Sequence, residues 1–365
     1  MPTVNIDHTK ALGIFRAASR LGTAENYRPS SPFREELQAI VTGPHLTYRY
    51  ILVTALLAKA TAPKANCLAL QAGASLRGAY DARSLCHKVI VPHEPDLLGK
   101  ALGGSNEPYL NKPARFQQIS LDNAVRPGKD QRTLHSLHAL LRKIGDADQA
   151  RVALQDALFF AIQRNRADKQ QIQGALEHVC GGRKSILAFI EMFVSKSING
   201  ETTALTAGAL FWVIGLSRGS KWAVHVHPVN EAGSSSNEIS DIDVRDGNTL
   251  VFTAEVKDKV FLMRDVMHAI GKVKAAALPR LHFIKGPRAE QTDGSEDVLA
   301  AQVAKEGIEL VVLDLHQMAD TVMAFAPTDI NLQAFATKLN DFAEQARAKA
   351  DTFTHLKETM ERLMR

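Results

Sequence analysis

The sequence predicts an α/β (α+β) protein in which a helical N-terminal region precedes a central mixed β-sheet flanked by helices. Two observations support this fold class. Residues 1–200 repeat apolar side chains at helical spacing, whereas residues 201–365 alternate strand patterns with helical ones. In the second half, the order helix, three strands, helix, strand, helix, strand is typical of one sheet covered by helices. We therefore expect two domains, 1–200 and 201–365.

Four segments of the first region carry helical patterns of apolar residues. In the second of them, Leu134, Leu137, Leu140 and Leu141 form a stripe along one helical face. The segments are residues 48–60, 132–144, 147–164 and 185–194. Residues 72–130 are rich in glycine and proline, and a loop region of this length in a compact domain is usually functional or disordered.

The second region begins with a helix and then alternates strands with helices. We expect helices over residues 201–216, 261–277 and 295–305, and strands over residues 222–228, 240–244, 250–257, 281–284 and 308–315. A polar loop over residues 230–237 separates the first two strands, and two helices close the chain. Strand 250–257 begins as a continuous apolar run, which indicates a buried central strand.

Composition and cysteine content favour a soluble, cytoplasmic protein. Hydrophobic residues make up 45% of the chain and charged residues 23%, as in ordinary globular proteins. The N-terminal segment lacks the continuous apolar region of a secretory signal, and the longest apolar stretch, residues 204–216, is too short to span a bilayer. We therefore expect no membrane partner. Cys67, Cys86 and Cys180 form no CxxC pair, which argues against a zinc finger and against a disulfide framework.

Charge is distributed unevenly between the two halves. Residues 1–200 contain 26 Lys and Arg against 16 Asp and Glu, a balance of +10, and residues 201–365 contain 18 against 23, a balance of −5. A basic half joined to a mildly acidic half predicts that the first offers a surface for a polyanion. Charge alone does not separate this interpretation from a chance excess of surface lysines and arginines.

A hairpin in the second region carries the residues best suited to chemistry. Its two strands flank an Asp-Gly turn, a strong hairpin signal. Side chains alternate between the faces of a strand, so Asp241 and Asp243 share one face, and Glu255 and Lys257 share one face. If the strands pair, the acids and the lysine converge. Carboxylate oxygens suit a hard cation and an ammonium group suits an attacked phosphate, so the hairpin predicts phosphodiester hydrolysis.

Alternatives stay open for the charged residues of this region. The hairpin acids could be an ordinary solvated face, although charges at the end of a buried strand need a partner or a metal. Glu201 could be a further metal ligand, or could interact only with the dipole of the helix that it begins. His225 and His227 share a strand face, but no third ligand with zinc spacing follows, which favours a structural or substrate-contacting role. Asp258 and Lys259 could contact phosphates, with solvated charges as the default.

The pattern of Asp243, Glu255 and Lys257, with hydrophobic residues beside each acid, resembles the PD-(D/E)xK nuclease superfamily. The predicted order of elements also resembles its restriction-endonuclease-like core. The resemblance implies that Asp243 and Glu255 bind Mg²⁺ and that Lys257 orients or activates a water and stabilises the transition state. Asp241 is the rival for the first acid, and we prefer Asp243 because it should lie closer to Glu255 across the hairpin. The usual proline before the first acid is absent, since Ser240 precedes Asp241.

Two polar blocks, residues 75–88 and 102–116, have the chemistry for contact with DNA. Arginine can bind guanine, asparagine adenine and glutamate cytosine, whereas lysine suits phosphates. The candidates are Arg77, Arg83, Lys88, Asn106, Glu107, Asn111, Lys112 and Arg115. For any single one of them, a structural role in turns and helix caps is the alternative.

These blocks and the hairpin together resemble the SacI family of type II restriction endonucleases over about residues 73–315. The resemblance implies a homodimer that makes Mg²⁺-dependent cuts at a short palindrome in double-stranded DNA. The family's namesake cuts GAGCTC, which makes a GAGCTC-like site the first candidate, although membership alone does not fix the site of this chain. We expect residues 1–200 to recognise DNA and residues 201–365 to cut it. The alternatives are a structure-specific repair or recombination nuclease with the same core, and a non-catalytic DNA-binding protein.

Overall fold

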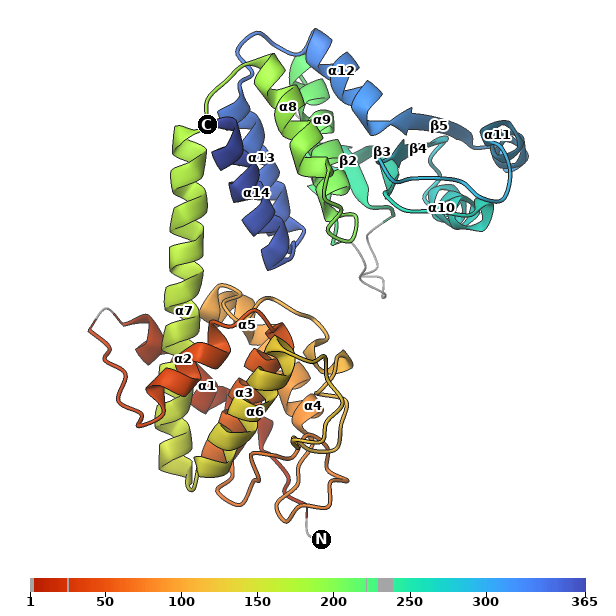
Figure 1. Cartoon of the computed structure of the whole chain (residues 1–365). Helices are drawn as coiled ribbons and strands as arrows, with labels where there is room; N and C mark the ends of the chain where they lie inside the picture. Colours follow the sequence, from red (N-terminus) through yellow and green to blue (C-terminus); the bar gives the residue numbers. More distant parts are fainter. Residues whose placement is uncertain (1–2, 25, 221, 229–238) are drawn as a thin grey trace. The chain divides into compact units, whose positions relative to one another are not determined.

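The computed structural model describes residues 3–24, 26–220, 222–228 and 239–365. The predicted polar loop 230–237 lies outside the described residues. The chain divides into two compact units, Met1–Gln170 and Gln171–Arg365, and Figure 1 shows the elements of each. The division precedes the boundary predicted at residue 200, because helix α8 (Arg183–Val194) packs its apolar side chains into the core of the second unit.

The N-terminal unit is built around helix α3 (Leu46–Thr61), which is buried along nearly its whole length. Its neighbours include α1 (His8–Thr23), α2 (Arg34–Val41) and α6 (Lys129–Lys143), and the first part of α7 (Ala147–His178) belongs to the same core. All contribute apolar side chains to one core. The mainly helical character predicted for this part of the chain is confirmed.

The glycine- and proline-rich stretch of residues 72–130 contains short helices as well as loops. They are α4 (Ala82–Leu85), a π-helical turn (Cys86–Ile90), α5 (Val91–Leu98) and a 3₁₀ turn (Pro108–Leu110). The backbone also pairs with distant segments, since the amide of Leu70 donates to the carbonyl of Gln117 and that of Ile119 donates to Leu68. The stretch is therefore an ordered surface on the helical core.

One buried carboxylate organises the loop that follows α5. Glu94 is 1% exposed and accepts hydrogen bonds from the Tyr50 hydroxyl at 2.5 Å, the Leu102 amide at 2.9 Å and the Gly104 amide at 3.0 Å. The Tyr50 hydroxyl accepts in turn from the amide of Ser105 at 2.8 Å. Because Tyr50 belongs to α3, these bonds attach the loop to the centre of the unit.

The C-terminal unit contains a five-stranded mixed sheet with the strand order β1-β2-β3-β4-β5. The strands are β1 (Trp222–Val226), β2 (Ile242–Asp246), β3 (Thr249–Lys257), β4 (Arg280–Lys285) and β5 (Glu309–Asp314). The first three are antiparallel, and β3, β4 and β5 are parallel. Helices α10 (Met263–Ala275) and α11 (Glu296–Ala304) connect the parallel strands. The predicted central mixed sheet flanked by helices is confirmed.

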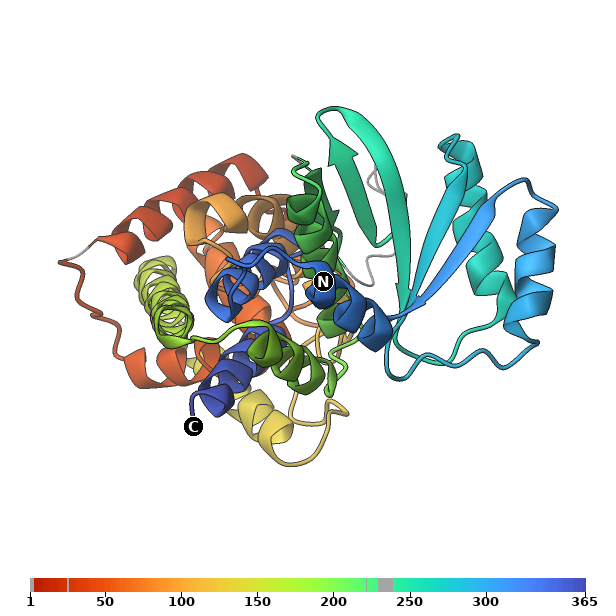
Figure 2. The same ribbon diagram turned by 90° about the horizontal axis from the view of Figure 1, so that it is seen from above.

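Different helices cover the two faces of the sheet (Figures 1 and 2). On one face, Val244 and Ile284 join a core that includes α8 and α9 (Glu201–Ser217). Helix α9 approaches closely at Gly208, where a Cβ atom would lie 2.4 Å from the Val226 side chain. On the other face, Phe283 packs with α10 and α11 in a separate core.

Three helices close the chain, so the expectation of two was wrong. They are α12 (Leu315–Phe325), α13 (Leu332–Gln345) and α14 (Ala350–Leu363). The chain breaks near Pro327, because proline lacks a donor for the helical hydrogen bond, and again at Arg347, whose φ is +52°. Within the described ranges, none of the helices is both long and apolar enough to cross a membrane.

Replacing Glu94 with alanine should destabilise the N-terminal unit by about 3 kcal/mol, because it leaves buried donors without an acceptor. Thermal or urea unfolding measures the change. Glu35→Ala, at an exposed position on α2, is the matched control and should change stability by less than about 0.5 kcal/mol. Equal stability of the two variants would contradict the role given to Glu94.

Candidate active site

Strands β2 and β3 form the predicted hairpin. They pair antiparallel across a tight turn at Gly247, whose φ of +58° suits a residue without a side chain. The apolar side chains of both strands point to the α9 side, where Val244 and Ala254 are fully buried. The charged side chains point to the opposite face, beside α10, so the predicted sharing of one face is confirmed.

The strand register decides which acid lies beside Glu255. Asp243 pairs with Thr253, so Asp241, two positions further from the turn, is opposite Glu255. The expectation that Asp243 lies closer to Glu255 is therefore wrong. In a hairpin, moving two residues away from the turn on one strand also moves two residues away from the turn on the other, so Asp241 lies opposite Glu255 and Asp243 lies opposite Thr253.

Asp241 lies where a negative charge is unfavourable. One of its oxygens accepts a hydrogen bond from the Val256 amide at 2.8 Å. Loss of hydration and the negative charge of Glu255 raise the pKa of Asp241 to about 7, against the opposing effects of Val256 and Lys257. Two carboxyl groups so placed favour the binding of either a proton or a cation.

Asp243 has a different environment, in which both carboxylate oxygens have partners within the protein. Thr253 donates its hydroxyl to Oδ1 at 2.7 Å, and Nε2 of His227 lies 3.0 Å from Oδ2. Burial raises the pKa of Asp243, but the hydrogen bonds from His227 and Thr253 outweigh it and hold the pKa below its usual value. Asp243 is thus an ionised carboxylate that holds His227, the residue after β1, in place.

Lys257 extends from the end of β3 on the same face as Glu255. Its ammonium nitrogen lies 2.5 Å from Oε1 of Glu255, and the side chain is 20% exposed. Burial lowers the pKa of Lys257, but the charges of Glu255 and Asp241 outweigh it and raise the pKa above its usual value. The lysine is therefore positively charged and partly accessible at neutral pH.

The chemistry of these groups fits a hard divalent cation. Among the described residues, no group of three or more His, Cys, Asp and Glu side chains could hold a metal ion by itself. Magnesium, however, usually keeps several waters and is bound through one or two carboxylates together with substrate phosphates. Asp241 and Glu255 provide such a pair of carboxylates, with the positive charge of Lys257 beside them.

Other predicted site residues have structural partners. Glu201 accepts from the Lys349 amide at 2.9 Å and from the Thr352 hydroxyl at 2.5 Å, and thereby joins α9 to α14. Its contacts in the described part of the chain do not include the hairpin acids. Nδ1 of His225 lies 2.9 Å from Nε2 of Gln345 on α13.

The two residues that follow Lys257 differ from one another. Lys259 is exposed, as expected, but Asp258 is buried, so the default of a solvated charge was wrong for it. Asp258 pairs instead with Arg288, 30 residues further along the chain. Sequence reasoning did not identify Arg288, because no local pattern connects it with the hairpin.

All eight predicted DNA-contacting residues are exposed in the N-terminal unit. Arg83 and Arg115 line a hollow of about 590 Å³, together with Asp81 and Tyr109. Glu107 accepts from Arg83 at 3.4 Å, which places it beside the same surface. The hollow is thus lined by Asp81 and Arg83 from the polar block 75–88 and by Arg115 from the block 102–116. The remaining candidates are Arg77, Lys88, Asn106, Asn111 and Lys112.

In the metal-free protein, Glu255→Gln should lower the pKa of Asp241 from about 7, because it removes the adjacent negative charge, while burial of the carboxyl group keeps the pKa above the usual value of about 4. A ¹³C-carboxyl NMR titration measures this, with Asp241→Asn to assign the signal. The raised pKa also means that Asp241 contributes stability at low pH, which is lost as the pH rises from about 4 to 7. The substitution should flatten that dependence, and an Asp241 that titrates near 4 in the unmodified protein would contradict this account.

Comparison with known families is consistent with the two-unit structure. A family model described as SacI restriction endonuclease N-terminal domain matches residues 10–165, within the first unit. A second, described as SacI restriction endonuclease C-terminal domain, matches residues 182–287, within the second unit. The search of curated proteins gave no match. The two matches cover most of the chain, which therefore belongs to the SacI restriction endonuclease family, a family of nucleases that act on DNA.

Proposed function

We propose that this protein is a type II restriction endonuclease that makes Mg²⁺-dependent, sequence-specific double-strand cuts in DNA. The observation that carries the proposal is the face of the β2–β3 hairpin on which Asp241, Glu255 and Lys257 lie together, in a chain of the SacI family. This arrangement corresponds to the acids and lysine of the PD-(D/E)xK pattern, with Asp241 as the first acid.

The metal would be held by Asp241 and Glu255 rather than by Asp243. Burial, and then the negative charge of Glu255, raise the pKa of Asp241, and a bound divalent cation would offset both effects. Both oxygens of Asp243 already have partners in Thr253 and His227. When bound, Mg²⁺ would lower the pKa of a coordinated water and neutralise charge on the phosphate. Glu201 has its own partners on α14 and is not part of the proposed ligand set.

The protein's side chains would position and stabilise the reacting phosphodiester. Lys257 is positively charged and would stabilise the negative charge that develops on the phosphate, as in a preorganised site. Attack by water in line with the 3′-oxygen then leaves a 5′-phosphate and a 3′-hydroxyl. His227, which is held by Asp243 just after β1, would lie beside the bound substrate.

Recognition of DNA is assigned to the N-terminal unit. Its surface presents the eight exposed candidate residues. Residues 1–200, which include this unit, have a net charge of +10. Arginines beside a hollow can donate two hydrogen bonds to guanine in the major groove. A short palindrome has twofold symmetry, which a homodimer matches with one subunit for each half-site. A GAGCTC-like sequence is the first substrate to test.

The purified protein should convert unmodified phage or plasmid DNA into discrete fragments only when Mg²⁺ is present. Lys257→Ala should slow cleavage by about 100-fold or more, because it removes the charge beside the phosphate. Lys259→Ala, at an exposed position two residues away, is the matched control and should retain activity. Absence of cleavage by folded protein on several DNA substrates would contradict the proposal, and smeared products or cleavage of branched DNA alone would favour a structure-specific nuclease.

The assignment of metal ligands can be tested without DNA. Asp241→Asn should weaken Mn²⁺ binding by about tenfold or more, because it removes a negatively charged ligand. Asp243→Asn should change the affinity by less than about threefold, since Asp243 bonds to the protein in the proposed arrangement. Isothermal titration calorimetry measures the Mn²⁺ affinity of both variants. A larger loss of affinity in Asp243→Asn than in Asp241→Asn would identify Asp243 as the metal ligand.

A further inference from the structure

The carboxylate of Asp258, the residue after Lys257, is buried, and both of its oxygens accept hydrogen bonds. The Asp258 side chain is 1% exposed, on the strand face opposite to that of Lys257. Its Oδ1 accepts from the backbone amide of Arg288 at 3.1 Å, and its Oδ2 accepts from Nη2 and Nε of the same residue at 2.6 and 3.2 Å. Charge-assisted bonds of this kind fix geometry as well as contributing energy.

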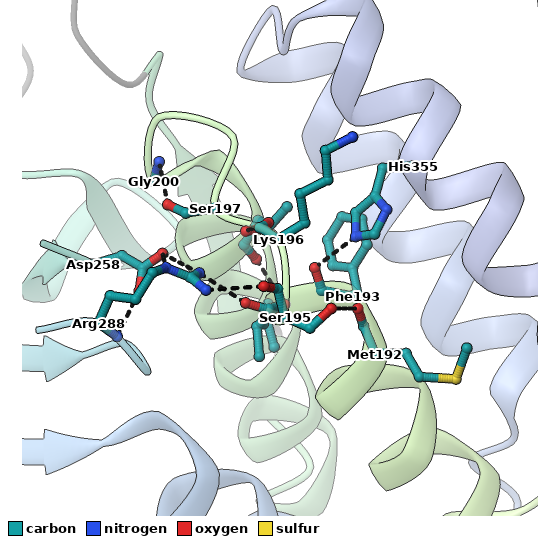
Figure 3. Close-up of polar contacts among 12 residues, drawn as sticks. Met192, Phe193, Ser195, Lys196, Ser197, Gly200, Asp258, Arg288 and His355 are labelled. Atoms are coloured by element: carbon teal, nitrogen blue, oxygen red, sulfur yellow. Dashed lines mark hydrogen bonds and ion pairs between the residues drawn. The ribbon is translucent and has the colours of Figure 1, made fainter.

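Arg288 also binds the end of a helix (Figure 3). Its Nη2 donates to the carbonyl of Val194 at 2.8 Å, and its Nη1 donates to that of Ser195 at 3.0 Å. Carbonyl groups at the C-terminus of a helix, here α8, carry partial negative charge and lack partners within the helix. A single guanidinium group thus joins three segments: the end of β3, the turn after β4 and the end of α8.

The turn after β4 holds the backbone of Lys257 as well. The amide of Gly286 donates to the carbonyl of Lys257 at 2.7 Å. A Cβ atom at residue 286 would lie 2.6 Å from Oδ1 of Asp258 and 2.8 Å from Thr203 on α9, so this close approach requires glycine. The backbone at Lys257 is therefore fixed at two points, the carbonyl of Lys257 and the side chain of Asp258.

We propose that Arg288 is a positioning residue for Lys257 and Glu255, an inference that rests on the nuclease function proposed above. Its bonds to Asp258 and to α8 set the position of the last residues of β3, and hence of the lysine on the opposite face. A lysine at position 288 cannot reproduce the planar fork that contacts one carboxylate and two carbonyl groups at once. Displacement of a catalytic group by about 1 Å can slow a reaction by about 100-fold.

The test compares Arg288→Lys with Arg280→Lys in the full-length protein. Arg280 is the matched control, because it pairs with Glu309 on the neighbouring strands but is 49% exposed. Three quantities are measured: the single-turnover rate of DNA cleavage with Mg²⁺, DNA affinity with Ca²⁺ in place of Mg²⁺, and hydrogen exchange of residues 255–258.

Arg288→Lys should slow single-turnover cleavage by about 10- to 100-fold, leave DNA affinity within about threefold and increase exchange at the end of β3. Arg280→Lys should leave all three nearly unchanged.

A rate within about twofold of the unmodified protein for Arg288→Lys would overturn the inference. A loss of rate matched by an equal loss of DNA affinity would also overturn it, because positioning of Lys257 affects chemistry rather than binding. If Arg288→Lys does not fold, Asp258→Asn, which keeps the size of the side chain, replaces it in the same three measurements, with the same expected and contradicting results. Inactivity of the unmodified protein identifies failure of the proposed function, whereas activity that is insensitive to both variants identifies failure of this inference alone.

Discussion

The pairing of β2 with β3 is the constraint on which the candidate site depends. Because strand side chains alternate, this one register sends Val244 and Ala254 into the core beneath α9 and sends the charged residues to the other face. A slip by one residue would bury the acids and expose the core side chains, which makes the register strongly specified. The electrostatics of Asp241 and Glu255 thus follow from the packing of the opposite face.

Two acids on one strand acquire different roles from their cross-strand neighbours. Asp243 bonds to Thr253 and His227, which stabilise its charge, whereas Asp241 is buried beside another carboxylate, and both effects destabilise its charge. The charge of Asp243 is stabilised by the protein alone, whereas the position of Asp241 favours the binding of a cation. Similar residues two positions apart therefore supply a structural carboxylate and a candidate ligand, and the α8–Arg288–Asp258 contacts hold the strand end that carries Lys257.

Sequence patterns predicted the order of helices and strands, the hairpin and the shared face of its charges, because all of these depend on local periodicity. Which of Asp241 and Asp243 lies opposite Glu255 could not be predicted, since it depends on the register, which is set by packing across the sheet. The Asp258–Arg288 pair was missed for a related reason, as its members lie 30 residues apart and meet only in the folded chain. The number of closing helices was wrong because the chain breaks twice after β5, near Pro327 and at Arg347.

The most direct test of the account is the position of a metal ion in the folded protein. Anomalous scattering from Mn²⁺ in a crystal of the protein with DNA would locate it. We predict a peak bonded to carboxylate oxygens of both Asp241 and Glu255, with the Lys257 ammonium group beside the same phosphate. A peak bonded to Asp243 and His227 instead, or one that excludes Glu255, would contradict the proposed centre.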